Sequence, residues 1–86
     1  MIKYSRSALE DLDRLENTAP GALALVEEAV LLLDRHPLLG REIEQGLREL
    51  IISRGKTGYV ALYFFDEQID EVIVLAVQHQ REAGYA

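Results

Sequence analysis

The sequence contains no cysteine and no tryptophan, and only two of its 86 residues are proline. The absence of cysteine excludes a disulfide framework, a thiolate zinc site and a cysteine nucleophile, so the fold must rest on hydrophobic packing. No uncharged apolar run approaches the roughly 20 residues that a transmembrane helix needs. We therefore expect a cytoplasmic protein with no secretion signal and no membrane association.

Positive charge is also scarce, with nine Lys and Arg residues against fifteen Asp and Glu residues and a formal net charge of −6. Proteins that bind nucleic acid through bulk charge neutralise phosphates with clustered Lys and Arg. We therefore expect no direct sequence-specific nucleic-acid binding by this chain alone. Its length allows one hydrophobic core, which predicts a single domain over residues 1–86.

The first half of the chain predicts a helical hairpin. Ile2–Tyr4 alternates and could form a short strand, after which Ser5 and Ser7 offer N-cap hydroxyls. Apolar residues then recur with helical period over residues 8–15, which predicts an amphipathic helix. Residues 20–36 are apolar on nearly all sides and predict the central core helix. Because the connecting turn is short, the two helices should pack as a hairpin.

After Gly46 the apolar period changes from 3.6 to 2, which predicts strands over residues 47–54, 59–65 and 71–79. The middle one is apolar on both faces and should lie at the centre of a sheet. The expected order is β-α-α-β-β-β, an α+β fold with the helical hairpin on one face of an antiparallel sheet. Whether Ile2–Tyr4 joins the sheet as an extra strand stays open.

The C-terminal tail holds the densest group of chemically active side chains: His79, Arg81, Glu82 and Tyr85. An imidazole, a guanidinium, a carboxylate and a phenol could together bind phosphate or transfer protons. The alternative is a solvated terminus whose Tyr85 folds back over the sheet.

The turn at residues 55–58 is the only locally basic part of the chain, with Lys56 inside it and Arg54 and Tyr59 beside it. It lacks the spacing and the following helix of a phosphate-binding loop, so an ordinary glycine-flanked hairpin explains it better.

The remaining polar residues give no sign of a metal or cofactor site. The two histidines, His36 and His79, lie in different predicted elements, and neither has a second ligand at helical spacing, so we expect no metal and no cofactor. The acidic residues of the first helix, such as Glu10, Asp11 and Asp13, read as a solvated face.

Four blocks of the sequence together resemble a known family. They are His36–Arg41, Gly46–Leu50, Gly58–Tyr63 and His79–Tyr85. In order and spacing they resemble the ParE/RelE superfamily of type II toxins over nearly the whole chain. The resemblance implies a toxin from a toxin–antitoxin operon that a cognate antitoxin, ParD-like or similar, holds inactive through a disordered segment that folds along the toxin surface.

The superfamily has two classes of target. RelE-like members cleave mRNA in the ribosome with basic residues on the sheet and a tyrosine near the C-terminus. When the sequence is aligned with that pattern at Gly58 and Tyr59, the positions that carry basic residues in RelE-like members are occupied by Ile51, Ser53 and Val60. The cationic cluster is therefore missing, although a ribosome-dependent mRNA endoribonuclease remains the alternative function, with His79, Arg81 and Tyr85 in acid–base and phosphate roles.

ParE-like members have no known catalytic residues and are associated with poisoning DNA gyrase. The missing cations and the tail make the sequence more similar to this branch, which implies a non-enzymatic inhibitor of gyrase with no catalytic residues. Contacts with gyrase would come from the exposed sheet face, the basic turn and the tail. The residues predicted to bind are Arg54, Lys56, Tyr59, His79, Arg81, Glu82 and Tyr85.

The acidity of this chain departs from the family, whose toxins are commonly basic and whose antitoxins are acidic. This acidity argues against electrostatic capture of an acidic antitoxin. The chain would need a less acidic antitoxin, or an apolar groove in which an amphipathic antitoxin helix buries its side chains.

Overall fold

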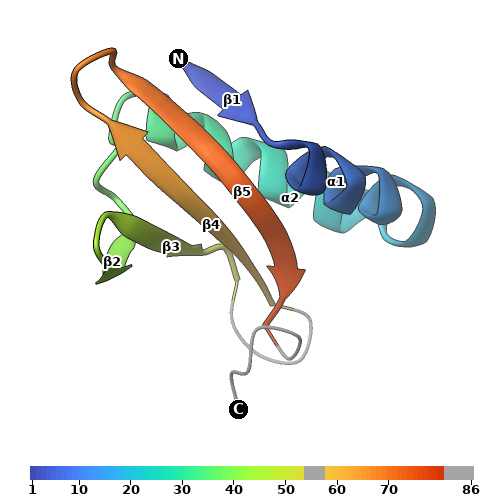
Figure 1. Cartoon of the computed structure of the whole chain (residues 1–86). Coiled ribbons are helices and arrows are strands. Elements are labelled where there is room, and N and C mark those ends of the chain that lie inside the picture. The colour runs from blue at the N-terminus through green and yellow to red at the C-terminus, as the bar shows by residue number, and fades with distance from the viewer. Residues whose placement is uncertain (54–57, 81–86) are drawn as a thin grey trace.

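The computed structural model describes residues 1–53 and 58–80 and has a sheet with two α-helices on one face (Figure 1). The elements in chain order are β1 (Ile2–Tyr4), α1 (Arg6–Thr18), α2 (Pro20–Leu31), the 3-10 helix η1 (Leu32–Asp34), β2 (Arg41–Glu44), β3 (Leu47–Ile51), β4 (Tyr59–Asp66) and β5 (Glu71–His79).

The strands form one five-stranded sheet in the order β1-β5-β4-β3-β2. β1 runs parallel to β5, and every other neighbouring pair is antiparallel. This arrangement confirms the predicted α+β fold, with the strand that is apolar on both faces, β4, at the centre. It also answers the question left open for Ile2–Tyr4, which joins the sheet as an outer strand.

The structure differs from the predicted order by one additional strand, β2. It pairs with β3 through a tight turn in which Gln45 and Gly46 have positive φ angles of 30° and 88°. All residues of β2 are exposed, so the strand has no alternation of buried and exposed side chains that would reveal it in the sequence. The second helix is also shorter than predicted: α2 ends at Leu31 and continues only as the 3-10 turn to Asp34.

The hydrophobic core lies between the helices and one face of the sheet. Val26, Val30 and Leu33 contribute from the helical layer, and Tyr63 and Val74 are among the fully buried residues of the sheet. Residues that pair across neighbouring strands share a face. The register therefore places Tyr59, Ala61, Tyr63 and Phe65 of β4 on the helix-covered face, and Val60, Leu62 and Phe64 on the open face.

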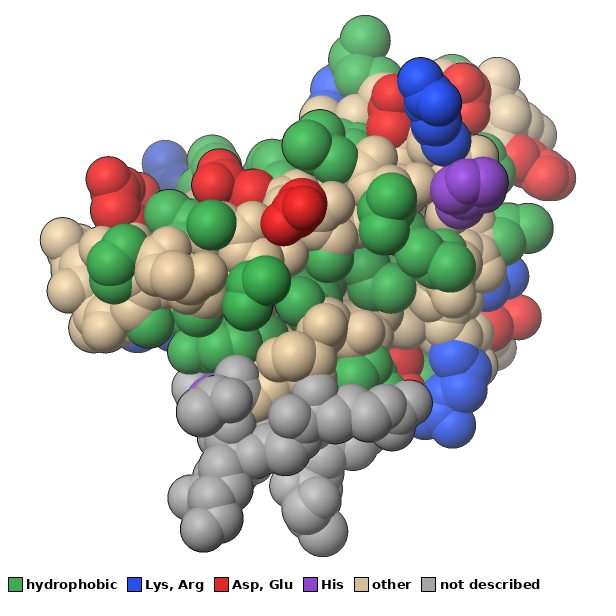
Figure 2. All heavy atoms as spheres, turned by 180° about the vertical axis from the view of Figure 1, so that it is seen from behind, with side chains coloured by type: hydrophobic (Ala, Val, Ile, Leu, Met, Phe, Trp, Pro, Cys, Tyr) green, Lys and Arg blue, Asp and Glu red, His purple; other side chains and the backbone are tan. Residues whose placement is uncertain are grey.

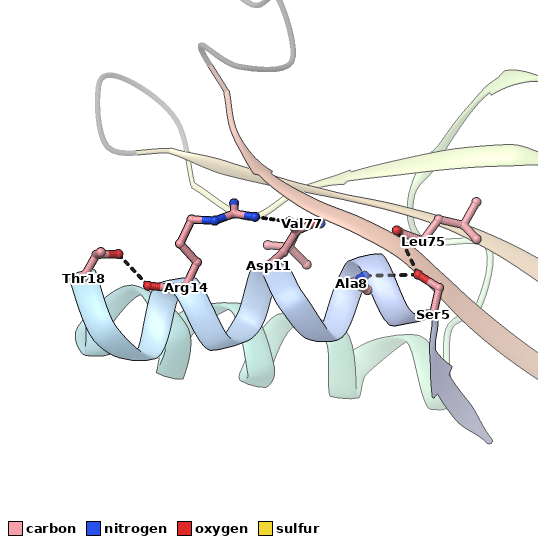
Figure 3. A network of polar contacts seen from close by, with 7 residues as sticks. All are labelled: Ser5, Ala8, Asp11, Arg14, Thr18, Leu75 and Val77. Atoms are coloured by element: carbon pink, nitrogen blue, oxygen red, sulfur yellow. Dashed lines mark hydrogen bonds and ion pairs between the residues drawn. The ribbon is translucent and has the colours of Figure 1, made fainter.

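Two side chains, those of Ser5 just before α1 and Asp11 within it, form hydrogen bonds with backbone groups of β5 beyond the residues that β1 pairs with (Figure 3). The Ser5 hydroxyl donates to the carbonyl of Leu75 at 3.0 Å and accepts from the Ala8 amide at 3.1 Å, which confirms Ser5 as the N-cap of α1. The amide of Val77 donates to Asp11 Oδ2 at 2.9 Å. Asp11 is therefore not part of a solvated acidic face, as the sequence led us to expect, but ties α1 to the sheet.

We expect Asp11→Ala to lower the free energy of unfolding by about 1–3 kcal/mol, because it leaves the amide of the buried Val77 without an acceptor. Urea unfolding followed by circular dichroism measures the change. Asp13→Ala is the matched control: it gains the same helix propensity at an exposed position and should change stability by less than about 0.5 kcal/mol. Equal effects of the two substitutions would contradict a linking role for Asp11.

Candidate functional site

Two of the predicted site residues lie side by side in the structure. Tyr59 opens β4 and His79 ends β5, and their rings meet edge to face with centroids 5.3 Å apart. Both are half-buried and line a small cavity of about 140 Å³ with Asp11, Arg14 and Thr18 of α1. They therefore lie on the helix-covered side of the sheet.

Two of the three positions at which the resemblance to RelE-like toxins implies cations, Ile51 and Val60, lie on the other side. Ile51 pairs with Val60, and Val60 pairs with Gln78, in one row across three strands. Consecutive residues of a strand point to opposite faces, so this row is on the open face while His79 points to the helices. Val60 is fully buried, and Ser53 accepts a hydrogen bond from the side chain of Gln80 through its carbonyl.

The cationic residues of the five strands are all engaged by neighbours. Lys3 Nζ lies 3.3 Å from Glu71 Oε2, and Arg41 Nε donates to Glu49 Oε1 at 3.1 Å. Arg48 Nη1 donates to the carbonyl of Gly40 at 2.7 Å. Within the described strands, these contacts hold each positive charge against an acceptor of the chain itself.

The loop between η1 and β2 is held in place by hydrogen bonds to the side chain of Tyr63. Its hydroxyl donates to the carbonyl of Pro37 at 2.8 Å and accepts from the amide of Gly40 at 2.8 Å. Burial raises the pKa of Tyr63, and the Gly40 amide and the Arg48 charge offset part of that rise. The hydroxyl therefore remains a donor at neutral pH and fixes a loop whose Leu38 and Leu39 side chains are exposed.

An open groove of about 640 Å³ lies between the helical layer and the free edge of β3. A second hollow of about 270 Å³, which includes Leu25 and Glu28, continues it along α2 and shares three lining residues. The groove is lined by Ala29, Leu32, Leu39, Gly40, Arg41, Glu49, Leu50, Ile51 and Ile52. Figure 2 shows hydrophobic side chains gathered across this side of the molecule.

The groove changes the interpretation of the second helix. The sequence predicts a central core helix, yet α2 fully buries only Val26 and Val30. Leu25 and Leu32 are 53% and 54% exposed and line the groove instead. The sequence analysis did not place a site here, although a helix that is apolar on more sides than one core can cover was a signal for it.

Five of the seven residues predicted to bind a partner lie outside the described residues: Arg54, Lys56, Arg81, Glu82 and Tyr85. Within residues 1–53 and 58–80, no cluster of three or more His, Asp or Glu side chains could hold a metal ion. Over the same part of the chain, no helix combines the length and hydropathy needed to span a membrane.

Comparisons with known proteins agree on one group. The family model of the ParE toxin of type II toxin-antitoxin system, parDE, matches residues 2–84. No curated protein matches the chain significantly. Among solved structures, the toxin-antitoxin complex RelBE2 from Mycobacterium tuberculosis contains a chain that is 30% identical, with 92% of this chain and 95% of that chain covered and a TM-score of 0.75.

A second solved structure shares the fold at lower identity. It is the heterotetrameric YoeB-YefM toxin-antitoxin complex from Staphylococcus aureus, which is 15% identical over 92% of this chain and 94% of that chain with a TM-score of 0.73. At this identity the similarity concerns the fold alone.

Proposed function

The chain belongs to the ParE toxin family of type II toxin–antitoxin systems, and we propose that it inhibits DNA gyrase by binding, without catalysis. A cognate antitoxin, ParD-like or similar, neutralises it. Two of the similar solved structures are toxin-antitoxin complexes, which supports an antitoxin partner. The observation that carries the choice of gyrase is the apolar Ile51–Val60 row on the open face of the sheet.

RNA cleavage by a ribose 2′-hydroxyl needs a base for its proton and cations for the phosphate. The row where the family places these cations has an isoleucine and a fully buried valine. Of the residues that the structure describes, His79 is the candidate base, and it points to the other side of the sheet. These placements favour binding over transcript cleavage.

The open face offers an apolar surface for a protein partner. Leu62 and Phe64 of β4 and Ile73 of β5 lie there, with Phe64 exposed and the other two half-buried. Apolar and aromatic side chains dominate the centres of protein interfaces. In this proposal Arg54, Lys56 and Arg81 add charge contacts with gyrase, and Tyr85 adds an aromatic one. Tyr59 lies on the helix-covered side of the sheet, so its contact with gyrase would be separate from this apolar surface.

A supercoiling assay with purified gyrase, run beside an in vitro translation assay that detects mRNA cleavage, tests the function. We expect inhibited supercoiling with intact message. Phe64→Asp should raise the inhibitory concentration about tenfold or more, because it places a charge in the apolar contact surface.

Ile69→Asp is the control, since Ile69 is also exposed but lies in the turn after β4, outside the strands that form the open face. It should inhibit gyrase as the parent chain does. Codon-linked message cleavage with unaffected gyrase would overturn the proposal in favour of the endoribonuclease.

A further inference from the structure

The outer edge of β5 changes its support along the strand. β1 pairs with β5 only from Val72 to Val74, and none of the described strands covers the later part of that edge. There Asp11 supplies a hydrogen-bond acceptor, since its Oδ2 accepts from the amide of Val77 at 2.9 Å. His79 follows two residues later, so it projects on the same face of the sheet as Val77. Asp11 therefore fixes the part of β5 from which His79 projects.

The small cavity of about 140 Å³ at this end of β5 lies between two aromatic rings and α1. The rings of Tyr59 and His79, which meet edge to face, belong to the sheet, and Arg14 lines the cavity from α1. Figure 3 shows the Arg14 side chain extending from α1 toward β5 beside Asp11. A cavity of this size accepts a single side-chain group of a partner rather than a helix or a strand.

The charge that this cavity offers to a partner is positive. Asp11 is the one acidic residue among its described lining residues, and both of its carboxylate oxygens are engaged. Its Oδ1 accepts from Arg14 Nη2 at 3.0 Å, and its Oδ2 accepts from the Val77 amide. Arg14 is 60% exposed and has further N–H donors on its guanidinium. Those donors can form charge-assisted hydrogen bonds with a carboxylate of another protein.

We infer that this cavity is a second contact site for gyrase, in which Arg14 binds an acidic side chain of gyrase and Asp11 is the positioning residue that holds His79 next to Tyr59. The inference rests on the proposed function, since it takes gyrase as the partner. The cavity lies on the helix-covered side of the sheet, whereas Phe64 lies on the open face, so the two contact sites can be altered separately.

A pair of arginine variants tests the charge contact. Arg14→Gln should weaken binding to gyrase about tenfold or more, because a charge-assisted hydrogen bond is lost. Isothermal titration calorimetry without DNA measures the affinity, and the supercoiling assay measures the inhibitory concentration. Arg6→Gln is the matched control, since it changes the net charge equally at an exposed position of the same helix that does not line the cavity. It should change both values less than about threefold.

A pair of Asp11 variants tests the positioning role while both remove the same charge. The asparagine side chain can still accept from the Val77 amide, whereas alanine cannot. Asp11→Ala should therefore bind gyrase about fivefold more weakly than Asp11→Asn, the effect of one net hydrogen bond. Tyr63→Phe is the control for stability, because it should also destabilise the fold, through the loop at Pro37 and Gly40, yet change binding less than about twofold.

Proton NMR of the imidazole rings shows whether His79 keeps its place. The sequence has two histidines, His36 and His79, so two sets of ring signals are expected. Asp11→Ala should shift the His79 signals in the direction in which Tyr59→Leu shifts them, because both variants lose the edge-to-face contact. Asp11→Asn should leave these signals close to those of the parent chain. A loss of stability alone, as in Tyr63→Phe, should not move them.

The outcomes separate this inference from the proposed function. If the parent chain inhibits gyrase and Arg14→Gln inhibits it as well as Arg6→Gln does, the second site is overturned and the apolar open face remains the contact surface. Equal binding of Asp11→Ala and Asp11→Asn overturns the positioning role. An effect of Arg14→Gln that requires DNA would make a DNA phosphate the occupant and overturn the acidic side chain. A parent chain that neither binds nor inhibits gyrase refutes the proposed function and the inference together.

Discussion

Replacing Tyr63 by alanine is expected to lower the free energy of unfolding by about 3–5 kcal/mol, a large part of the roughly 5–15 kcal/mol that stabilises a domain. Tyr63 is fully buried on the central strand and is the largest such side chain of the core. Its loss removes packing against the helices and frees the loop that ends at Gly40. Urea unfolding followed by circular dichroism measures the change.

Tyr63→Phe isolates the hydroxyl from the ring. It should cost about 1–3 kcal/mol, because the Pro37 carbonyl and the Gly40 amide both lose a buried partner. Tyr4→Phe is the control, since no described residue hydrogen-bonds to the Tyr4 hydroxyl, and it should cost less than about 0.5 kcal/mol. Indistinguishable losses in the two phenylalanine variants would contradict the role given to the Tyr63 hydroxyl.

Tyr63→Phe should also change how the stability of the chain depends on pH. Burial raises the pKa of Tyr63 in the folded state above its unfolded value of about 10. The unfolded chain therefore releases this proton first as the pH rises, and stability is lost as the pH passes from about 10 toward the folded pKa. Tyr63→Phe should reduce that alkaline loss without abolishing it, because burial also raises the pKa of Tyr4.

The sequence predicted the elements whose side chains carry a clear period. β5 spans the predicted residues 71–79, and β4, whose run is apolar on both faces, lies at the centre of the sheet as predicted. The N-cap at Ser5 was predictable for the same reason, since the hydroxyl and the amide that it accepts from are local.

The elements that the sequence did not predict depend on partners distant in the chain. β2 is held by its pairing with β3 and exposes every side chain, so its residues carry no period. Asp11 resembles its acidic neighbours on α1, and only the end of β1 at Tyr4 leaves the Val77 amide for it to accept from. Local patterns do not record where a neighbouring strand stops.

The groove could not be located from the sequence for a related reason. Periodicity shows that α2 is apolar on several sides, but it does not show which side the sheet covers. The sheet reaches Val26 and Val30, and it leaves Leu25 and Leu32 exposed because the end of β3 lacks an outer neighbour. The charge of the chain therefore led us to expect an apolar groove, but where an apolar groove lies required the structure.

Gly40→Ala is expected to lower the free energy of unfolding by about 2–3 kcal/mol. An added Cβ would lie 2.7 Å from the backbone oxygen of Glu49 and 2.7 Å from the Tyr63 hydroxyl, so relief requires β2 to separate from β3. Urea unfolding followed by circular dichroism measures the change.

Gly21→Ala is the control for this prediction. Its Cβ would meet nothing within 4 Å in the first turn of α2, so it should stabilise the chain by about 0.5–1 kcal/mol. If Gly40→Ala unfolded at the same urea concentration as the parent chain, the close contact between the loop, β3 and Tyr63 would not be what positions Leu39 beside the groove.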